Sequence, residues 1–484
     1  YTNYYFIGIG GIGMSSLAEY MLHLNKKIAG YDREKSFQSQ RLINLGIRII
    51  FSESEQKINS IFKNSKNTLI VFTPAINNNN KILSYFKSNN FKIVKRADLL
   101  AEIVNSSFCI AIAGTHGKTT TTSILSHILY NSKLKFTSFI GGVIKKYQTN
   151  IIINGNDIFI VEADEFDKTF LKIKPNIASI LNIDGDHYDI YKDLDEINYS
   201  FKKFANSLKK NGILFHNSNL DLNGISFGEN SFADAQIINK KNHKGKTIFD
   251  IKYQNNIYRD IELNMLGDHN SFNAMVAFII AISLGIDAKL IIKSLKSFPG
   301  IMRRFSIELN NPKIFIDDYA HHPSEINSVY NSLESLYPNK KKLVIFQPHL
   351  FLRTKDFLSE FAEALEKFDK IALLDIYPAR EKPIKGITSK SIFDRINNKS
   401  LHISQELLKV LKMLDAIHLF HRCEDVDNIQ NYYIDQKNLY GFLQTLGLHG
   451  YNATYLVFEC DHLEEWGLKN NEPPKNVRIC LLIY

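Results

Sequence analysis

The sequence predicts an α/β protein of three consecutive domains followed by an atypical tail. Residues 4–20 and 108–130 each show the pattern of a buried strand, a glycine-rich turn and a helix, which begins a strand–helix unit. After Gly300, strands and helices alternate again, as α/β folds require. At roughly 150 residues per domain, a chain of 484 residues also favours about three domains. The predicted domains are residues 1–105, 106–302 and 303–415, and the divergent tail is 416–484.

The first domain is predicted to have a Rossmann-like fold. Its opening apolar run enters a cluster of Gly8, Gly10, Gly11 and Gly13, and a helical pattern follows. A second short strand ends at Asp32, where acidic residues of dinucleotide folds often bind a ribose or a base. The glycines alone are a weak signal, because they fit any phosphate-bearing nucleotide and also a purely structural turn. Further strands are expected near residues 47–51, 69–73 and 92–95.

The second domain holds the strongest signal, a P-loop variant with one residue fewer than usual between its glycines. It follows a buried-strand pattern and precedes a predicted helix at residues 121–130. In such a loop the backbone N–H groups face a phosphate. Lys118 would reach the β- and γ-phosphates, and the Thr119 hydroxyl would coordinate Mg²⁺. Further strands of one parallel sheet are expected near residues 158–161, 177–181 and 212–215, with a long helix at 267–286.

Carboxylates cluster directly after the predicted strand at residues 158–161. They are Glu162, Asp164, Glu165 and Asp167. Ligands of parallel sheets bind at this end of the strands, and Mg²⁺ prefers few carboxylates plus waters and phosphates, so a magnesium site is predicted. A solvated acidic loop is the alternative. His187 ends a similar stretch, but nitrogen matches Mg²⁺ poorly, so chemistry alone does not make it a ligand.

The third domain is predicted to be a second Rossmann-like α/β unit. Its strands are expected near residues 314–316, 343–346 and 371–374. His321 and His322 are adjacent, and neighbouring side chains on an extended segment point in opposite directions. The two histidines therefore cannot form a simple bidentate metal site. A substrate contact and a core position both remain open for them.

Composition excludes several other classes of protein. Hydrophobic residues make up 44% and charged residues 23%, as in ordinary globular proteins. The longest apolar stretch, around residues 275–286, is too short to cross a bilayer, and no secretory signal is visible at the start. The four cysteines lack the spacing of a disulfide framework or a zinc site. The lysines behind the net charge of +9 are scattered, which fits a solvated surface, and we expect no nucleic-acid partner. The cysteines are expected to be reduced thiols of a cytoplasmic protein.

A series of short motifs runs in order from the first domain into the third. They are GIGGIGMS at 8–15, TPAI at 73–76, GTHGKTTT at 114–121, EADEFD at 162–167, DHYD at 186–189, GDHNSFNA at 267–274, RRF at 303–305, DDYAHHP at 317–323, QPHLFLRT at 347–354 and YPARE at 377–381. With these motifs the chain resembles the Mur ligase family from about residue 4 to residue 390. The GIGGIGMS opening and the doubled histidine favour the alanine-adding member over enzymes later in the pathway.

The resemblance implies an ATP-dependent, ADP-forming amide synthesis in peptidoglycan precursor formation. The carboxylate of UDP-N-acetylmuramate would attack the γ-phosphate of ATP to give an acyl phosphate, which the amine of L-alanine then attacks. Its cofactors would be ATP and Mg²⁺. The first domain would hold the UDP moiety rather than a dinucleotide, and a homodimer is left open.

The resemblance also implies roles for individual residues. By this resemblance Glu162 and His187 contact the metal ion, although a histidine nitrogen matches Mg²⁺ poorly on chemical grounds. Asn270 and Asn273 would contact the adenine. Arg303 and Asp317 would complete the nucleotide pocket. The candidates are, for catalysis, Lys118, Glu162, His187 and His321; for ATP, Gly114, Thr115, His116, Gly117, Lys118, Thr119, Thr120, Asn270, Asn273, Arg303 and Asp317; for the UDP-sugar, Gly10, Gly11, Ile12, Gly13, Met14, Ser15, Asp32, Thr73, Pro74 and Ala75; and for the metal, Thr119, Glu162 and His187.

The tail departs from the family pattern. The third domain of the family normally ends in a strand and a glycine-rich GAGD- or GAGN-type motif, which is missing after about Asp415. Loss of the last strand–helix unit would expose a sheet edge.

Two other functions stay open: a related ligase that attaches a recycled murein peptide to UDP-N-acetylmuramate, and a non-catalytic nucleotide-binding protein.

Overall fold

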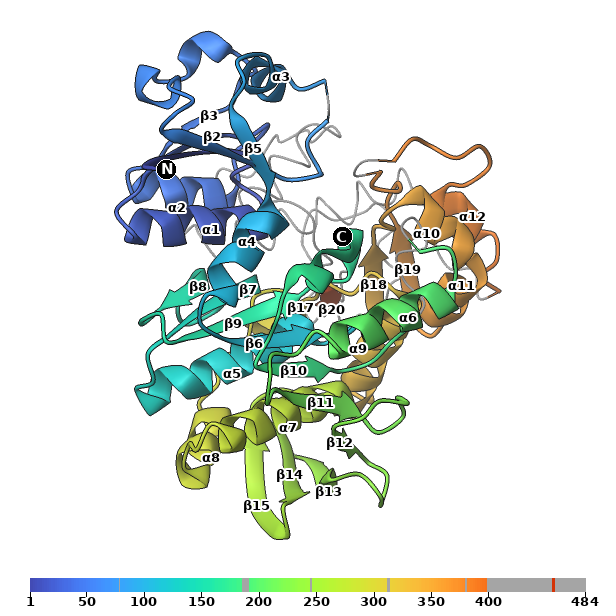
Figure 1. Ribbon diagram of the computed structural model, residues 1–484. Coiled ribbons are helices and arrows are strands. Elements are labelled where there is room, and N and C mark those ends of the chain that lie inside the picture. Colours follow the sequence, from blue (N-terminus) through green and yellow to red (C-terminus); the bar gives the residue numbers. More distant parts are fainter. Residues whose placement is uncertain are drawn as a thin grey trace, which may run out of the picture. The chain divides into compact units, whose positions relative to one another are not determined.

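The computed structural model describes residues 1–77, 79–184, 191–243, 246–310, 314–378, 381–397 and 455–457 (Figure 1). The chain forms two compact units, residues 1–301 and 302–484. No helix in the described part of the chain is long and apolar enough to cross a membrane.

The first unit opens with a five-stranded parallel sheet in the order β3-β2-β1-β4-β5. Side chains alternate between its two faces. Tyr4 and Phe6 pack with helices α1 and α4, whereas Tyr5 and Ile7 pack with helix α3. All the strands predicted for this domain are confirmed. The elements are β1 (Asn3–Ile7), α1 (Ile12–His23), β2 (Lys27–Tyr31), α2 (Phe37–Asn44), β3 (Arg48–Ile50), β4 (Thr68–Phe72), α3 (Lys81–Ser88), β5 (Lys92–Lys95) and α4 (Arg96–Asn105).

The same unit continues into a ten-stranded sheet in the order β15-β14-β13-β12-β11-β10-β6-β9-β7-β8. Strands β13 to β7 in this order are parallel, but β14 and β15 at one edge and β8 at the other are antiparallel. The strands predicted to form one parallel sheet, β6, β9, β10 and β11, are parallel as predicted, whereas the antiparallel edge strands were not predicted. The strands are β6 (Phe108–Ala113), β7 (Phe136–Ile144), β8 (Thr149–Ile153), β9 (Ile158–Ala163), β10 (Ile177–Ile180), β11 (Ile213–Asn217), β12 (Ile225–Gly228), β13 (Ala235–His243), β14 (Lys246–Tyr253) and β15 (Asn256–Leu263).

Helices cover both faces of the ten-stranded sheet. Ile110 and Ile112 of β6 face helices α5 (Lys118–Ser132) and α7 (Asp268–Ser283), with α8 (Ala288–Lys296) beside them. Cys109 and Ala111 face the other way, toward helix α6 (Leu194–Ala205). Strand β6 is thus buried on both faces, which is why its sequence is apolar throughout. Its carboxyl end leads directly into the P-loop.

A buried histidine joins α5 to the elements around it. His127 is 1% exposed, and Asn131 Nδ2 donates to its Nε2 at 3.3 Å. Nδ1 lies 2.7 Å from the Tyr147 hydroxyl, and Nε2 also lies 3.1 Å from the Ser297 hydroxyl. Burial, helped by the charge of Lys146, lowers the pKa of His127 to about 4. The ring is neutral in the folded protein at pH 7.

We expect His127 to make the unit sensitive to acid. Its folded pKa lies below the unfolded value, so the stability it contributes is complete above about pH 6.5 and is lost as the pH falls toward 4. The loss amounts to roughly 3 kcal/mol for this shift. Urea unfolding of the wild type and of His127→Gln between pH 7 and pH 4 measures it. The variant should lose less stability over this range; equal slopes would contradict the prediction.

The second unit contains a three-stranded antiparallel sheet, β16-β17-β20, and the parallel pair β18 and β19. The three predicted strands are confirmed. Within the tail, where an exposed edge was expected, residues 455–457 pair with β17; the rest of 398–484 lies outside the described residues. The elements are β16 (Ser306–Asn310), β17 (Ile314–Asp317), α9 (Pro323–Leu336), β18 (Leu343–Phe346), α10 (Phe351–Asp356), α11 (Leu358–Glu366), β19 (Lys370–Leu373), α12 (Ser389–Phe393) and β20 (Tyr455–Val457).

Candidate active site

The P-loop connects β6 to α5 through two glycines with positive φ. Gly114 has a φ of +137° and Gly117 has a φ of +87°, values that L side chains rarely adopt. A Cβ atom on Gly117 would lie 2.5 Å from Asn273 Oδ1, so glycine is required there for space as well as for conformation. The loop ends at Lys118, the first residue of α5. The first N–H groups of that helix have no acceptors within it, which makes this end suited to an anion.

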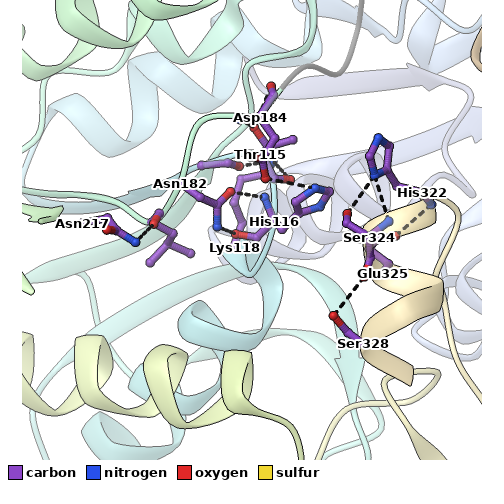
Figure 2. Close-up of polar contacts among 12 residues, drawn as sticks. Thr115, His116, Lys118, Asn182, Asp184, Asn217, His322, Ser324, Glu325 and Ser328 are labelled. Carbon is purple, nitrogen blue, oxygen red and sulfur yellow. Dashed lines mark hydrogen bonds and ion pairs between the residues drawn. The ribbon is translucent and has the colours of Figure 1, made fainter. Parts of the chain in front are cut away.

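The side chain of Asn182 braces the loop from the end of the neighbouring strand β10 (Figure 2). Its Oδ1 accepts from the backbone N–H of His116 at 2.8 Å, and its Nδ2 donates to the His116 carbonyl at 3.1 Å. Next to it, the Asp184 N–H donates to the Thr115 hydroxyl at 2.9 Å, and the carboxylate of Asp184 lies 3.5 Å from His116 Nε2. The loop is therefore held in shape before any phosphate binds.

We expect Asn182→Ala to weaken ATP binding. The change leaves both backbone groups of His116 without this partner, and two hydrogen bonds of about 1 kcal/mol each correspond to a KM for ATP roughly tenfold higher or more. Steady-state kinetics measures this. Asn217→Ala is the matched control, because Asn217 donates to the Leu181 carbonyl beside the loop but not to the loop itself. An equal rise of the KM for ATP in both variants would contradict a specific role of Asn182 in holding the loop.

Lys118 is held by the protein's own acceptors. Its Nζ donates to the Gly114 carbonyl at 2.6 Å and to both oxygens of Glu165 at 2.8 and 3.0 Å. Burial by itself lowers the pKa of Lys118, but the carboxylates of Glu165, Asp164 and Glu162 outweigh it and hold the pKa above its ordinary value. Lys118 therefore carries its positive charge at the mouth of the P-loop.

Two hard oxygen groups meet beside Lys118. The Thr119 hydroxyl donates to Glu162 Oε2 at 2.9 Å, and the Gly141 N–H of strand β7 donates to Glu162 Oε1 at 2.5 Å. Burial raises the pKa of Glu162, against these two hydrogen bonds and the charge of Lys118. An alcohol and a carboxylate at this spacing fit Mg²⁺, which takes few protein ligands and completes its shell with phosphates and water.

Of the three residues predicted to contact the metal ion, the structure describes Thr119 and Glu162. His187 lies outside the described residues, as does the DHYD motif. Among the residues that are described, no three His, Cys, Asp or Glu side chains form a group that could hold a metal ion alone. The Thr119–Glu162 pair would thus have to share an ion with phosphates or with residues outside the described part.

The two asparagines of helix α7 have different partners. Asn273 accepts from the Thr121 hydroxyl at 3.2 Å and contacts Gly117, so it lies directly behind the P-loop. Asn270 donates to the Leu266 carbonyl at 2.6 Å. Both side chains are buried, as is Thr120. Their predicted contacts with ATP stay predictions.

The glycine turn of the first domain brings its predicted residues to the carboxyl ends of β1, β2 and β4. The Gly10 N–H donates to Asp32 Oδ2 at 2.7 Å, and burial raises the pKa of Asp32 against this and two further backbone bonds. Gly8 lies against Thr73, where a Cβ atom would be 2.7 Å from Thr73 Cγ2. Pro74 and Ala75 follow Thr73 in the turn after β4.

The helix that follows the turn is partly buried. Met14 and Ser15 are 2% and 0% exposed, so their predicted contacts with a UDP-sugar would need an opening that the structure does not have. Ile12 is half-buried and Gly11 is exposed. Gly13 lies against the Arg96 guanidinium, whose Nη1 would be 2.9 Å from a Cβ atom on Gly13. Arg96 is a cation beside the predicted pyrophosphate site that the sequence did not reveal.

In the second unit, the predicted residues form local contacts of their own. Arg303 Nε lies 3.8 Å from Asp317 Oδ2. His321 Nδ1 lies 3.2 Å from Glu325 Oε2 and 3.0 Å from the Tyr319 carbonyl. His322 is the N-cap of α9, and its Nδ1 accepts from the Ser324 N–H at 3.3 Å (Figure 2). The doubled histidine is therefore part of a helix cap.

Sequence reasoning missed residues whose roles depend on long-range pairing. Gly141 and Gly142 of β7 approach Glu162 and Thr119 so closely that Cβ atoms would lie 2.6 Å from Glu162 Oε2 and 2.9 Å from Thr119 Cγ2. A Gly-Gly pair inside a strand is a signal of close backbone approach, and it was available in the sequence. Glu165 stood in the acidic cluster, but its pairing with Lys118 could not be read from spacing.

Comparison with known proteins matches all three parts of the chain. Residues 3–108 match the Mur ligase family catalytic domain, residues 112–281 the Mur ligase middle domain, and residues 303–427 the Mur ligase glutamate ligase domain. The UDP-N-acetylmuramate–L-alanine ligase of Flavobacterium psychrophilum is 46% identical over 419 residues, covering 86% of this chain and 93% of that protein. The enzyme of the same name from Christiangramia forsetii is 43% identical, with 86% and 92% covered.

A solved structure agrees with these sequence matches. The crystal structure of the UDP-N-acetylmuramate–alanine ligase of Thermotoga maritima is 26% identical and superposes with a TM-score of 0.73, covering 85% of this chain and 93% of that one. The predicted family resemblance is thus confirmed by domain matches, close relatives and fold. The chain belongs to the Mur ligase family.

Proposed function

We propose that this protein is an ATP-dependent, ADP-forming ligase that joins L-alanine to the carboxylate of UDP-N-acetylmuramate in peptidoglycan precursor synthesis. The observation that carries the proposal is the charged Lys118 at a preformed P-loop, next to the Thr119–Glu162 oxygen pair. Relatives at 43% and 46% identity that carry this activity in their names support the choice of substrates.

The reaction needs charge neutralisation on a moving phosphoryl group. The muramate carboxylate oxygen attacks the γ-phosphorus as ADP leaves, which gives an acyl phosphate. The alanine amine then attacks the acyl carbon, phosphate leaves and the amine loses a proton. Lys118 would turn from Glu165 toward the β- and γ-phosphates, while α5 directs its N-terminus at them. Mg²⁺, held by Thr119 and Glu162, would neutralise the phosphate charge.

The UDP-sugar would bind at the glycine turn of the first domain. The N–H groups of Ile12 and Gly13, at the start of α1, would face the pyrophosphate, and Arg96 adds a positive charge at Gly13. Asp32, whose carboxylate already accepts from Gly10, fixes the turn. The predicted domains 1–105, 106–302 and 303–415 assign the UDP-sugar to the first of these and ATP to the second.

The remaining parts of the proposal rest on the resemblance. Arg303, Asp317 and His321 would act on the nucleotide or substrate, and His187 on the metal. A cytoplasmic location fits the substrates, which are cytoplasmic precursors and ATP.

Phosphate release tests the proposed function. With ATP, Mg²⁺ and UDP-N-acetylmuramate, we expect release that depends on L-alanine and is much slower with the murein tripeptide as acceptor. Faster release with the tripeptide would favour the peptide-recycling ligase. Binding of ATP without release under any of these conditions would favour a non-catalytic nucleotide-binding protein, although the Lys118 and Glu162 geometry argues against it.

A further inference from the structure

Strand β8 of the central sheet places a buried amide against the glycine turn of the first domain. Asn150 is 1% exposed. Its Nδ2 donates to the Ile12 carbonyl at 2.5 Å and to the Ser15 hydroxyl at 3.1 Å. Its Oδ1 accepts from Arg41 Nη1 at 3.4 Å. The amide nitrogen and the amide oxygen of Asn150, which belongs to the predicted ATP-binding domain, thus both form hydrogen bonds with the predicted UDP-binding domain.

The two acceptors of Asn150 lie in the first turn of α1. Ile12 is the first residue of that helix, and the Ser15 hydroxyl donates to the Ile12 carbonyl at 3.0 Å. This turn provides the N–H groups that the proposed function directs at the pyrophosphate. A shift of the Ile12 carbonyl would turn the adjoining peptide groups and so change where those N–H groups point.

Arg41 ties the amide into a larger network. It forms an ion pair with Glu19 of α1 and donates to Asn150, so it links α2, α1 and β8. The side chains of Arg41 and Glu19 are 19% and 18% exposed. A network that is largely buried holds its members in place, because leaving one buried polar group without its partner is costly.

We propose that Asn150 is a positioning residue for the UDP-sugar, acting from the ATP-binding domain on the first turn of α1. It does not touch the ligand. It fixes the Ile12 carbonyl and the Ser15 hydroxyl so that the turn keeps the shape that binds the pyrophosphate. The inference rests on the proposed function, which places the UDP moiety at this turn.

The test is calorimetric titration of the full chain with UDP-N-acetylmuramate and, separately, with a non-hydrolysable ATP analogue. In Asn150→Ala we expect the Kd for the UDP-sugar to rise roughly tenfold, the size expected for loss of hydrogen bonds that orient a site. The Kd for the ATP analogue should stay unchanged. In turnover, the KM for UDP-N-acetylmuramate should rise more than kcat falls, a split that general destabilisation would not produce.

Asn150→Asp sharpens the test. An aspartate of the same shape can still accept from Arg41, but its carboxylate cannot donate to the Ile12 carbonyl. We therefore expect Asn150→Asp to lose UDP-sugar affinity as Asn150→Ala does. Affinity equal to that of the wild type would overturn the role of this hydrogen bond.

Asn156→Ala is the control for the contact between the two domains in general. Asn156 accepts from the Tyr20 hydroxyl at 3.2 Å, so it also joins the central domain to α1, but two turns away from Ile12 at 3.6 residues per turn. We expect its UDP-sugar affinity to match the wild type. Equal losses in Asn156→Ala and Asn150→Ala would overturn the inference, and so would a normal Kd in Asn150→Ala. A wild type that fails to bind the UDP-sugar would instead overturn the proposed function.

Discussion

Lys118→Ala should abolish most turnover while leaving the affinity for UDP-N-acetylmuramate nearly unchanged. Lys118 is the cation that the P-loop supplies to the transferred phosphate, and removing one such group typically costs roughly 10³-fold or more in kcat. The UDP-sugar is proposed to bind at the glycine turn of another domain. Single-turnover phosphate release and calorimetry with the UDP-sugar measure the two effects separately.

The controls for Lys118→Ala separate chemistry from folding. Lys133→Ala makes the same change of charge at the exposed far end of the same helix and should keep full activity. Lys118→Ala takes from Glu165 its cationic partner, so the double variant with Glu165→Gln should recover stability without recovering turnover. Recovery of turnover in the double variant would mean that Lys118 serves the fold rather than the phosphate.

The P-loop could be predicted because every signal for it is local. An apolar strand, two glycines at fixed spacing and a helix lie within 25 residues of one another, and the structure reproduces them in that order. The Gly141 contact with Glu162 could not be predicted in this way. It exists because β7 pairs in parallel with β9, a register that no spacing along the chain encodes.

The antiparallel edges of the central sheet were missed for a related reason. Strands β14 and β15 are joined through Gln254 and Asn255, both with positive φ, which is the conformation of a tight hairpin turn. Glycine usually marks such a turn in a sequence. Because neither turn residue is glycine, the sequence did not indicate a hairpin here. Conversely, the capping role of His322 was readable, because a proline and a glutamate follow it at the positions of a helix start.

Gly117→Ala should weaken ATP binding strongly even though it adds only one methyl group. The residue has a φ of +87°, and the new Cβ atom would meet Asn273 Oδ1 at 2.5 Å and Leu181 Cδ1 at 3.1 Å. Relief requires the loop to move away from α7, which would misdirect the first N–H groups of α5. We expect a Kd for ATP at least roughly tenfold higher, together with a stability loss of about 1–3 kcal/mol.

Gly285→Ala separates the steric part of this effect from the conformational part. Gly285 lies between α7 and α8 and has a φ of +76°, but nothing lies within 4 Å of its Cβ position. Its alanine variant should therefore lose only about 1–2 kcal/mol of stability, the cost of a left-handed residue, with normal ATP affinity. Calorimetry and urea unfolding of both variants give the comparison. If Gly117→Ala bound ATP as tightly as Gly285→Ala, the P-loop would not need its close approach to Asn273, and the preformed cradle inferred for ATP would be wrong.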